Sequence, residues 1–415
     1  MVTLDSAEIG ARARVIRRRR GMSLDATAGL AGISKSYLSM LETGARRFER
    51  RGLLEDLAGA LGCSVVDLTG QPYLPIDRAS ADALAAVPGI RSALHEYGPD
   101  DVPAVPSRPL DELTQWASDT LEQCGQARYS VAGRDIGTLL TSLQAHATTA
   151  TGSDRDRAFT GVVTACFSAG VVASRTGNID LAVAAARRGV DLAHRHDNPG
   201  LIGFACWYWA LELTSVAARA RAQAVLADAI DGLAPSARWG HSADSRPAEV
   251  IGMMHLQQAR AVARERQVDD AHAHLCEAAT LAARLGERNG FRQHFGPTNV
   301  AAWPVSIGIE LGEGVRAYEE AIRAPIDVAA LGSAERSSSL HLDLARALVQ
   351  DGGARDGEAI RYLDAADRIA PQRIRNDPIA RELVTTLDRR ARRRVWELDS
   401  LKNRFGIGGR QIHRA

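Results

Sequence analysis

The stretch that decides the fold is residues 32–44, which read GISKSYLSMLETG. Gly32 provides the backbone conformation that a sharp turn between two helices requires, and Ser34 is a suitable N-cap for the helix that follows. Apolar residues at helical spacing form one face of that helix, namely Ile33, Leu38 and Leu41. The opposite face carries short polar groups and one cation, namely Lys35, Ser36 and Ser39. A helix of this form is typical of an element that enters the DNA major groove, although an amphipathic helix of an ordinary bundle shows the same spacing.

The flanking segments indicate that this helix belongs to a small domain of five helices. Apolar residues recur at helical spacing before residue 20, a second helix is expected from Ser23 to Ala31, and two more follow Gly44. The frame that runs from Ala28 through Gly32 to Gly44 resembles the helix-turn-helix family of the phage Cro and cI repressors, also called the XRE family. The resemblance covers roughly residues 8–70 and implies an all-α domain that binds double-stranded DNA.

The resemblance also implies which residues contact the DNA. Four residues of the third helix are expected to read base edges: Lys35, Ser36, Tyr37 and Ser39. Five residues are expected to contact phosphates: Arg17, Ser34, Thr43, Arg46 and Arg47. Three positions depart from the family pattern, where Gln, Leu and a basic residue are common: Leu24, Thr27 and Met40. These departures affect the operator sequence that the helix would read rather than the fold of the domain.

The charge of the first 70 residues fits a nucleic-acid partner. They contain 11 Lys and Arg against 8 Asp and Glu, whereas the whole chain has a formal net charge of +1. A basic patch supplies phosphate contacts, and the alternative for the arginines at 17–20 is a solvated helix face. One such domain reads only a short half-site and no second one is visible, so we expect a homodimer.

Composition limits the rest of the chain. A length of 415 residues allows two or three domains, and 45% hydrophobic residues with only 5% aromatic ones favour close-packed helices. No signal peptide and no apolar run of about 20 residues is seen, and the five cysteines form no Cys-x-x-Cys pair. We therefore expect a reduced cytoplasmic protein, with a redox-sensing pair as the alternative. Lys35 and Lys402 are the only lysines, which is typical of a GC-rich, actinobacterial genome.

The remaining sequence is expected to form a hinge, a helical-repeat domain and a tail. Seven prolines in residues 71–110 predict a semi-rigid hinge with one helix from Ala79 to Tyr97, broken at Pro88-Gly89. Residues 111–405 repeat a unit of two helices with alanine near the start of the second helix, at Ala182, Ala222, Ala271, Ala317 and Ala359. This half resembles a degenerate tetratricopeptide solenoid. The basic run at 389–394 is interpreted as a final capping helix with a solvated arginine face, and the alternative is a non-specific phosphate contact. Residues 406–415 are expected to form a disordered tail.

Seven residues are candidates for ligand contact in the trough of such a solenoid. Phe295, Asn299 and Trp303 are spaced to share one helix face. The full set of candidates is Phe204, Tyr208, Gln258, Arg292, Phe295, Asn299 and Trp303. Aromatic rings with amides and an arginine suit a peptide or a small amphipathic molecule. The alternative is that these aromatic residues belong to the core between repeats.

The two domains together resemble the intracellular quorum-sensing peptide receptors of Gram-positive bacteria and the actinobacterial regulators of the same layout. The resemblance implies a transcription regulator whose solenoid binds a signal, forms a homodimer and controls operator binding. The alternative is a solenoid that holds a partner protein, without a small signal molecule. No phosphate-binding Gly-rich loop, nucleophile motif or metal-spaced cluster is seen. The His194/His196 and His272/His274 pairs have i, i+2 spacing, which points to different sides of a helix. We expect no enzyme activity, no cofactor and no metal.

Overall fold

The computed structural model describes residues 9–104, 108–237 and 244–407, and every regular element within these ranges is helical. The amino-terminal domain contains five helices: α1 Ile9–Arg19, α2 Leu24–Leu30, α3 Lys35–Thr43, α4 Arg51–Leu61 and α5 Val65–Thr69. The predicted helix boundaries at the turn are confirmed, because the hydroxyls of Ser23 and Ser34 cap α2 and α3. These five helices share an apolar core that includes Leu38, Leu54 and Leu57, and Ile379 from the carboxyl-terminal end of the chain also packs in it.

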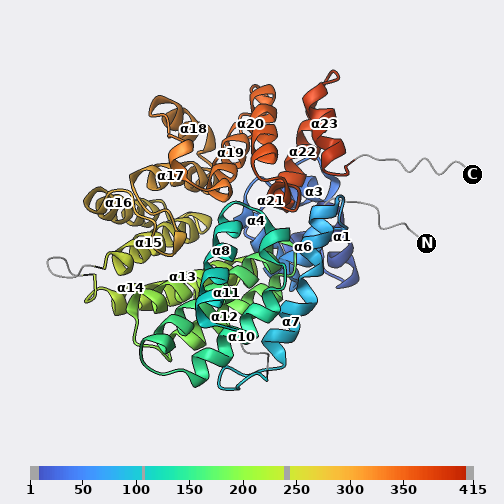
Figure 1. Ribbon diagram of the computed structural model, residues 1–415. Helices are drawn as coiled ribbons and strands as arrows, with labels where there is room; N and C mark the ends of the chain where they lie inside the picture. The colour runs from blue at the N-terminus through green and yellow to red at the C-terminus, as the bar shows by residue number, and fades with distance from the viewer. Residues whose placement is uncertain (1–8, 105–107, 238–243, 408–415) are drawn as a thin grey trace, which may run out of the picture.

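The rest of the chain forms a helical-repeat domain of paired antiparallel helices. It begins with α6 Arg78–Ala85, α7 Val87–His95, α8 Leu110–Gly125, the short α9 Tyr129–Ala132 and α10 Ile136–Thr149. Five long pairs follow: α11 Gly152–Arg175 with α12 Ile179–Ala193, α13 Pro199–Ser215 with α14 Arg219–Leu233, α15 Arg246–Arg264 with α16 Val268–Leu285, α17 Pro297–Leu311 with α18 Gly314–Arg323, and α19 Ala334–Val349 with α20 Asp356–Ile369. Single turns η1 Gly290–Arg292 and η2 Ala329–Leu331 precede α17 and α19. In Figure 1 the pairs follow an arc from α11 and α12 through α15 and α16 to α19 and α20.

The alanines that marked the repeat are the residues at which paired helices meet. Ala182, Ala222, Ala271 and Ala359 are each 0% exposed, and Ala317 is 7% exposed. A residue with only a methyl group allows the two helices of a pair to approach closely, and each pair then buries its inner face against the next pair. The predicted all-α architecture, a helix-turn-helix domain followed by a helical-repeat solenoid, is confirmed.

The predicted hinge is wrong for its helical part. Helices α6 and α7 pack on the repeat domain, since Val87, Ile90 and Leu94 belong to its main apolar core. The break falls at Ala86 rather than at Pro88-Gly89. Pro88 lies in the first turn of α7, where a helix needs no backbone donor, so it starts a helix rather than interrupting one.

The carboxyl-terminal end closes the repeat domain with α21 Pro371–Arg375, α22 Pro378–Arg390 and α23 Trp396–Arg404. The prediction that the basic run at 389–394 lies on a capping helix is wrong for most of the run, because α22 ends at Arg390 and α23 begins at Trp396. Arg389 and Arg390 donate to the carbonyl oxygens of Gly44 and Val349, so neither is a purely solvated charge. Most of the predicted tail, residues 408–415, lies outside the described residues.

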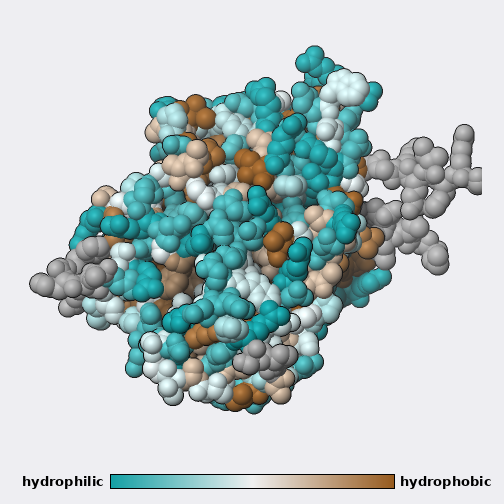
Figure 2. Space-filling view, viewed as in Figure 1, coloured by the Kyte–Doolittle hydropathy of each residue, from teal (hydrophilic) through white to brown (hydrophobic). Residues whose placement is uncertain are grey.

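Most apolar side chains are buried, as the surface (Figure 2) and the longest helix both show. The face seen in Figure 2 is mainly hydrophilic, with apolar residues in separate small patches. Within the described ranges, α11 is the one helix long and apolar enough to cross a membrane by length and composition, but 78% of its most apolar window is buried in the protein. It packs there as a core helix of the first long pair.

Candidate nucleic-acid interface and ligand cavity

Helix α3 is fixed in the amino-terminal domain by its apolar face and by one close backbone approach. Leu38 and Leu41 are 0% and 1% exposed. Gly10 of α1 lies against the same helix, and a Cβ on it would come within 1.9 Å of the Leu41 carbonyl oxygen. Gly32, in the turn before α3, has φ +64°, a conformation that glycine adopts without strain. The tight packing of its inner face therefore sets the orientation of α3.

The predicted base-reading residues lie on the outer side of α3 to different degrees. Lys35 and Ser36 are exposed, and Ser39 is partly exposed. Tyr37 is also only partly exposed, because its ring packs against the core of the domain, and this burial raises its pKa. Lys35, Ser36 and Ser39 therefore form the accessible polar face, while Tyr37 offers only part of its side chain.

Three of the predicted phosphate-contacting residues are exposed at the two ends of α3: Ser34, Thr43 and Arg46. The Ser34 hydroxyl accepts a hydrogen bond from the Tyr37 backbone N–H at 3.2 Å. The Thr43 hydroxyl donates to the Ser39 carbonyl oxygen at 2.9 Å. Both hydroxyls keep free hydrogen-bonding capacity, since a hydroxyl offers one donor and two acceptor sites.

Arg17 is not a phosphate-contacting residue. It is 8% exposed, and its Nε and NH2 donate to the two Glu42 carboxylate oxygens at 2.5 and 2.8 Å. The hydrogen bonds that Arg17 donates to Glu42 raise the pKa of Arg17, so the guanidinium stays charged inside the domain. A two-point pair of this kind joins α1 to the end of α3. A carboxylate among the apolar positions of α3 is the signal in the sequence that α3 needs a buried basic partner.

Arg47, also predicted to contact a phosphate, is buried as well. It is 7% exposed, and its NH1 lies 3.3 Å from the Glu382 carboxylate of α22. Nearby, Arg390 of α22 lies 3.8 Å from Glu49. This part of the amino-terminal domain is therefore covered by the carboxyl-terminal end of the chain, which no local sequence pattern indicated.

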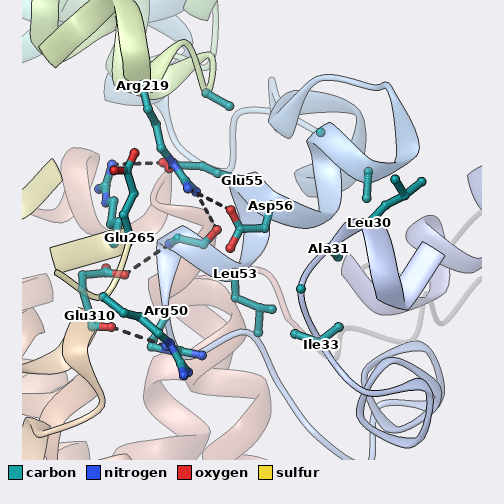
Figure 3. A pocket seen from close by; sticks show the side chains of 17 residues that line it. Leu30, Ala31, Ile33, Arg50, Leu53, Glu55, Asp56, Arg219, Glu265 and Glu310 are labelled. Atoms are coloured by element: carbon teal, nitrogen blue, oxygen red, sulfur yellow. Dashed lines mark hydrogen bonds and ion pairs between the residues drawn. The ribbon is translucent and has the colours of Figure 1, made fainter. Parts of the chain in front are cut away.

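A second contact between the amino-terminal domain and the repeat domain is centred on Glu55 of α4, which meets residues at the start of α14 and the end of α15. The Glu55 side chain is 0% exposed, and its oxygens lie 2.7 Å from Arg219 Nε and 3.0 Å from Arg264 NH1. Arg219 also donates to Asp56 at 2.8 Å and to the Gly52 carbonyl oxygen at 2.7 Å. Figure 3 shows Arg219 reaching from the repeat domain to Glu55 and Asp56 on α4.

Glu310 of α17 completes this contact from the other side. It is 3% exposed, and its oxygens accept hydrogen bonds from the backbone N–H groups of Arg51 and Gly52 at 3.3 and 3.2 Å. Burial opposes ionisation of Glu310, but Arg346 and Arg264 outweigh it and lower its pKa. The anion thus lies at the amino-terminal end of α4, which carries a partial positive charge. We call the contacts of Glu55 and Glu310 with their partners the interdomain interface.

The repeat domain contains a cavity of about 220 Å³ between the inner faces of α8, α11, α13, α15, α17 and α19. Its aromatic walls are formed by Phe167, Trp207, Tyr208 and Trp303. Four of the seven predicted ligand-contacting residues line it: Tyr208, Arg292, Asn299 and Trp303. Asn299 is 3% exposed, and its amide donates to the His294 carbonyl oxygen at 2.9 Å.

The other three predicted ligand-contacting residues are core residues. Phe204 is 1% exposed and stacks on Phe291 at a ring distance of 4.8 Å. Gln258 faces away from the cavity and donates to the Gln223 carbonyl oxygen at 2.9 Å. Phe295 is 0% exposed, and its ring fills the space where a Cβ on Gly252 would lie, at 2.1 Å. Phe295 also precedes α17, so it does not share a helix face with Asn299 as its spacing predicted.

Buried and partly buried charges line one wall of the cavity. Glu335 accepts from Arg373 Nε at 3.0 Å and also contacts Arg175 and the Tyr129 hydroxyl. Burial opposes its ionisation, but the two guanidiniums and the hydroxyl outweigh it and lower the pKa of Glu335 to about 2. Glu212 differs, because burial outweighs the nearby Arg175 and raises its pKa to about 7. The wall therefore holds one firmly ionised carboxylate and one that titrates near neutral pH.

The remaining titratable groups form no metal site in the part of the chain that the structure describes, since no group of three or more His, Cys, Asp and Glu side chains is arranged to bind an ion. Two histidines do lie in contact, His255 and His274, and their Nδ1 atoms are 3.0 Å apart. Burial lowers the pKa of His255 to about 4. The cysteines are free thiols, and burial raises the pKa of Cys124 and Cys166 to about 12.

Comparison with known proteins assigns the amino-terminal domain. Residues 8–69 match the family model described as "Helix-turn-helix domain". A search of the curated proteins finds no match. Among solved structures, that of PlcR from Bacillus thuringiensis in complex with the peptide PapR7 and DNA aligns with 68% of this chain and 96% of PlcR. The identity is 14% and the TM-score is 0.29, and a likeness at this level transfers no role to any residue of this chain.

Proposed function

Because residues 8–69 form a helix-turn-helix domain, we propose that the protein is a sequence-specific DNA-binding transcription regulator. The observation that carries the proposal is the accessible polar face of α3, opposite a face fixed to the domain core. In this proposal Lys35, Ser36 and Ser39 contact base edges. Ser34, Thr43 and Arg46, which are exposed at the ends of α3, contact phosphates and set the orientation of the helix on the duplex. A homodimer presents two such helices to two half-sites.

The second part of the proposal is that the cavity of the repeat domain binds a signal, a small molecule or part of a peptide. Its aromatic walls and few polar groups match the composition of small-molecule sites. A partner protein bound by the solenoid remains the alternative, and the test below distinguishes the two.

The positions of the cavity and the interdomain interface support control of the DNA-binding domain by the signal. Each of four helices carries a cavity-lining residue and, about one turn later, a residue that contacts the amino-terminal domain or supports that contact. The pairs are Glu212 and Ser215 on α13, Arg260 and Arg264 on α15, Ser306 and Glu310 on α17, and Asp343 and Arg346 on α19. A ligand that shifts any of these helices changes the interdomain interface, and it thereby favours one position of the DNA-binding domain.

Fluorescence anisotropy titrations test the proposal. The duplex is taken from the region upstream of the gene, and an unrelated duplex of equal length measures non-specific binding. We expect the native chain to discriminate between them and to lose affinity steeply with salt, because several phosphates are contacted. The triple variant Lys35→Ala, Ser36→Ala, Ser39→Ala should lose about 100-fold in discrimination, since each good base contact contributes about 1–3 kcal/mol.

The matched control is Arg316→Ala, which changes an exposed residue of α18, a helix well separated from α3 in Figure 1. This variant should bind as the native chain does. Repeating the titrations with a culture extract tests the signal. An extract that alters binding, and keeps this ability after proteins are removed, supports a small signal, whereas activity that is lost with the proteins supports a partner protein. Equal binding of both duplexes at every salt concentration would contradict the DNA-binding proposal.

A further inference from the structure

We infer that the cavity of the repeat domain selects an organic oxyanion on a flat apolar body, a carboxylate or a phosphate ester, rather than a neutral ligand. The inference deepens the proposed function and rests on the signal-binding role given there to the cavity. It follows from the charges that line the cavity and from the polar atoms that point into it.

The first observation is a pair of arginines on Trp303. The guanidinium carbons of Arg260 and Arg336 lie 5.2 and 6.0 Å from the centroid of the Trp303 ring, and all three residues line the cavity. Arg260 donates to the neutral amide of Gln257 at 2.5 Å. Among the described residues, no carboxylate makes an ion pair or a hydrogen bond with either guanidinium. Both cations therefore face the cavity with only aromatic or neutral neighbours in direct contact.

The nearby carboxylates are engaged elsewhere. Glu335 is shared by Arg175 and Arg373, and Asp343 pairs with Arg346 at 2.8 Å. Glu212 is held partly protonated near neutral pH, because burial raises its pKa to about 7. The cavity wall therefore keeps an excess of positive charge that these carboxylates do not neutralise.

The second observation is a set of buried polar atoms without hydrogen-bond partners. Trp207 and Gln293 are 5% and 3% exposed. The unpartnered donors among the lining residues are Trp207 Nε1, Gln293 Nε2, Arg175 Nε and Arg373 NH1. A buried donor without an acceptor is costly, so donors of this number point to a ligand that brings acceptor oxygens. Gln293 Oε1 is likewise without a partner. The Tyr208 hydroxyl and the Glu212 carboxyl lie next to each other, and they can donate to or accept from a polar substituent on the same ligand.

Carboxylate and phosphate oxygens match this arrangement. Their lone pairs accept two hydrogen bonds from one guanidinium in a planar fork. The rings of Phe167, Trp207 and Trp303 offer apolar faces to the rest of the molecule. A neutral ligand would displace water from Arg260 and Arg336 without forming an ion pair with either, so the cost of desolvating the two cations would not be compensated. Burial lowers the pKa of Arg260 to about 9 and that of Arg336 to about 10. A bound oxyanion would offset this unfavourable desolvation of the two cations.

Isothermal titration calorimetry of the full-length protein tests the inference with matched probes. The probes are 2-naphthoate and 2-naphthyl phosphate, and the neutral control is 2-naphthamide, which has nearly the shape of the carboxylate. We expect at least one oxyanion to bind at least tenfold more tightly than the amide. The better of the two identifies carboxylate or phosphate as the preferred group. Inorganic phosphate alone should displace either probe only weakly, because it lacks the apolar body.

The variants Arg260→Gln and Arg336→Gln should each reduce oxyanion binding about tenfold and leave binding of the amide within twofold. Arg316→Gln on the exposed face of α18 is the control and should behave as the native chain. Circular dichroism and thermal unfolding should show that both cavity variants remain folded, since each removes a cation without a carboxylate partner. Equal binding of amide and oxyanions, loss of both in the arginine variants, or no binding of any probe at about 1 mM would overturn the inference. None of these readouts depends on DNA, so failure of the DNA-binding proposal is seen separately in the anisotropy titrations.

Discussion

Replacing Glu55 by glutamine is expected to release α4 from the repeat domain while the amino-terminal domain stays folded. The Glu55 side chain is 0% exposed and faces two guanidiniums of the repeat domain, those of Arg219 and Arg264. Glutamine keeps the shape of the side chain and removes the charge. We call the arrangement in the structure, with α4 against the repeat domain, the closed position, and an arrangement in which α4 has left it the released position. In the closed position of the variant both cations lack their buried counter-ion, whereas in the released position water solvates them.

The magnitude follows from this burial. Removing one partner of a buried ion pair costs about 3–5 kcal/mol, and about 3 kcal/mol reduces the ratio of closed to released molecules by more than 100-fold. The matched control is Asp56→Asn, since Asp56 is the next residue and also pairs with Arg219. The Asp56 side chain is 39% exposed, so its loss should cost less than about 1 kcal/mol.

Hydrogen–deuterium exchange on the full chain measures the result. In Glu55→Gln the backbone N–H groups of Arg51 and Gly52, which donate to Glu310, should exchange much faster. Exchange in α1 and α5 should change little, because residues of the five helices form most of the core on which α1 and α5 pack. Asp56→Asn should resemble the native chain in both regions. Equal protection of α4 in the two variants, or equal loss of protection through all five helices, would refute the reasoning.

Three further predictions concern stability. Arg17→Ala should lower the free energy of unfolding by about 3–5 kcal/mol, because it leaves the Glu42 carboxylate buried without its partner; urea denaturation measures this, and a loss below 1 kcal/mol would mean that the pair is not structural. Glu212 keeps its proton up to about pH 7 in the folded state but only to its usual value of 4.5 when unfolded, so its contribution to stability is lost as pH rises from about 4.5 to 7. Between pH 5 and pH 8 the variant Glu212→Gln should therefore lose up to about 3 kcal/mol less unfolding free energy than the native chain. Thermal unfolding at both pH values measures this difference, and identical pH dependence of the two proteins would contradict the raised pKa of Glu212. Gly10→Ala places a methyl group 1.9 Å from a carbonyl oxygen of α3 and should cost about 1–3 kcal/mol, whereas Gly59→Ala on α4 meets no atom within 4 Å and should be neutral or slightly stabilising.

The parts of the fold that could be predicted from the sequence are those governed by local chemistry. The turn before α3 depends on Gly32 and on the cap at Ser34, which lie within three residues of each other. The repeat could be recognised because each pair needs a small residue, such as Ala182 or Ala271, where its two helices meet. Signals of this kind act over one or two helical turns, so the spacing of residue types is enough to locate them.

The interdomain interface could not be predicted, because it joins residues far apart in the sequence. Glu55 and Arg219 are separated by 164 positions. The chain contains 51 basic and 50 acidic residues, so the sequence offers many possible ion pairs and does not indicate which of them form. The partner of Arg17 could not be predicted either, since only the folded domain brings Arg17 to Glu42. In the cavity, spacing located Asn299 and Trp303, but it did not reveal that η1 and the turn before α17 separate Phe295 from them.

Selection of bound duplexes from a random DNA library tests most directly that the chain reads DNA sequence through α3. The full-length protein is compared with the triple variant Lys35→Ala, Ser36→Ala, Ser39→Ala, and bound duplexes are sequenced after each round. We expect the native chain to enrich a motif of two related half-sites about one helical turn apart, and the variant to enrich none. A native chain that enriches no motif, or a variant that enriches the same one, would contradict this reading of α3.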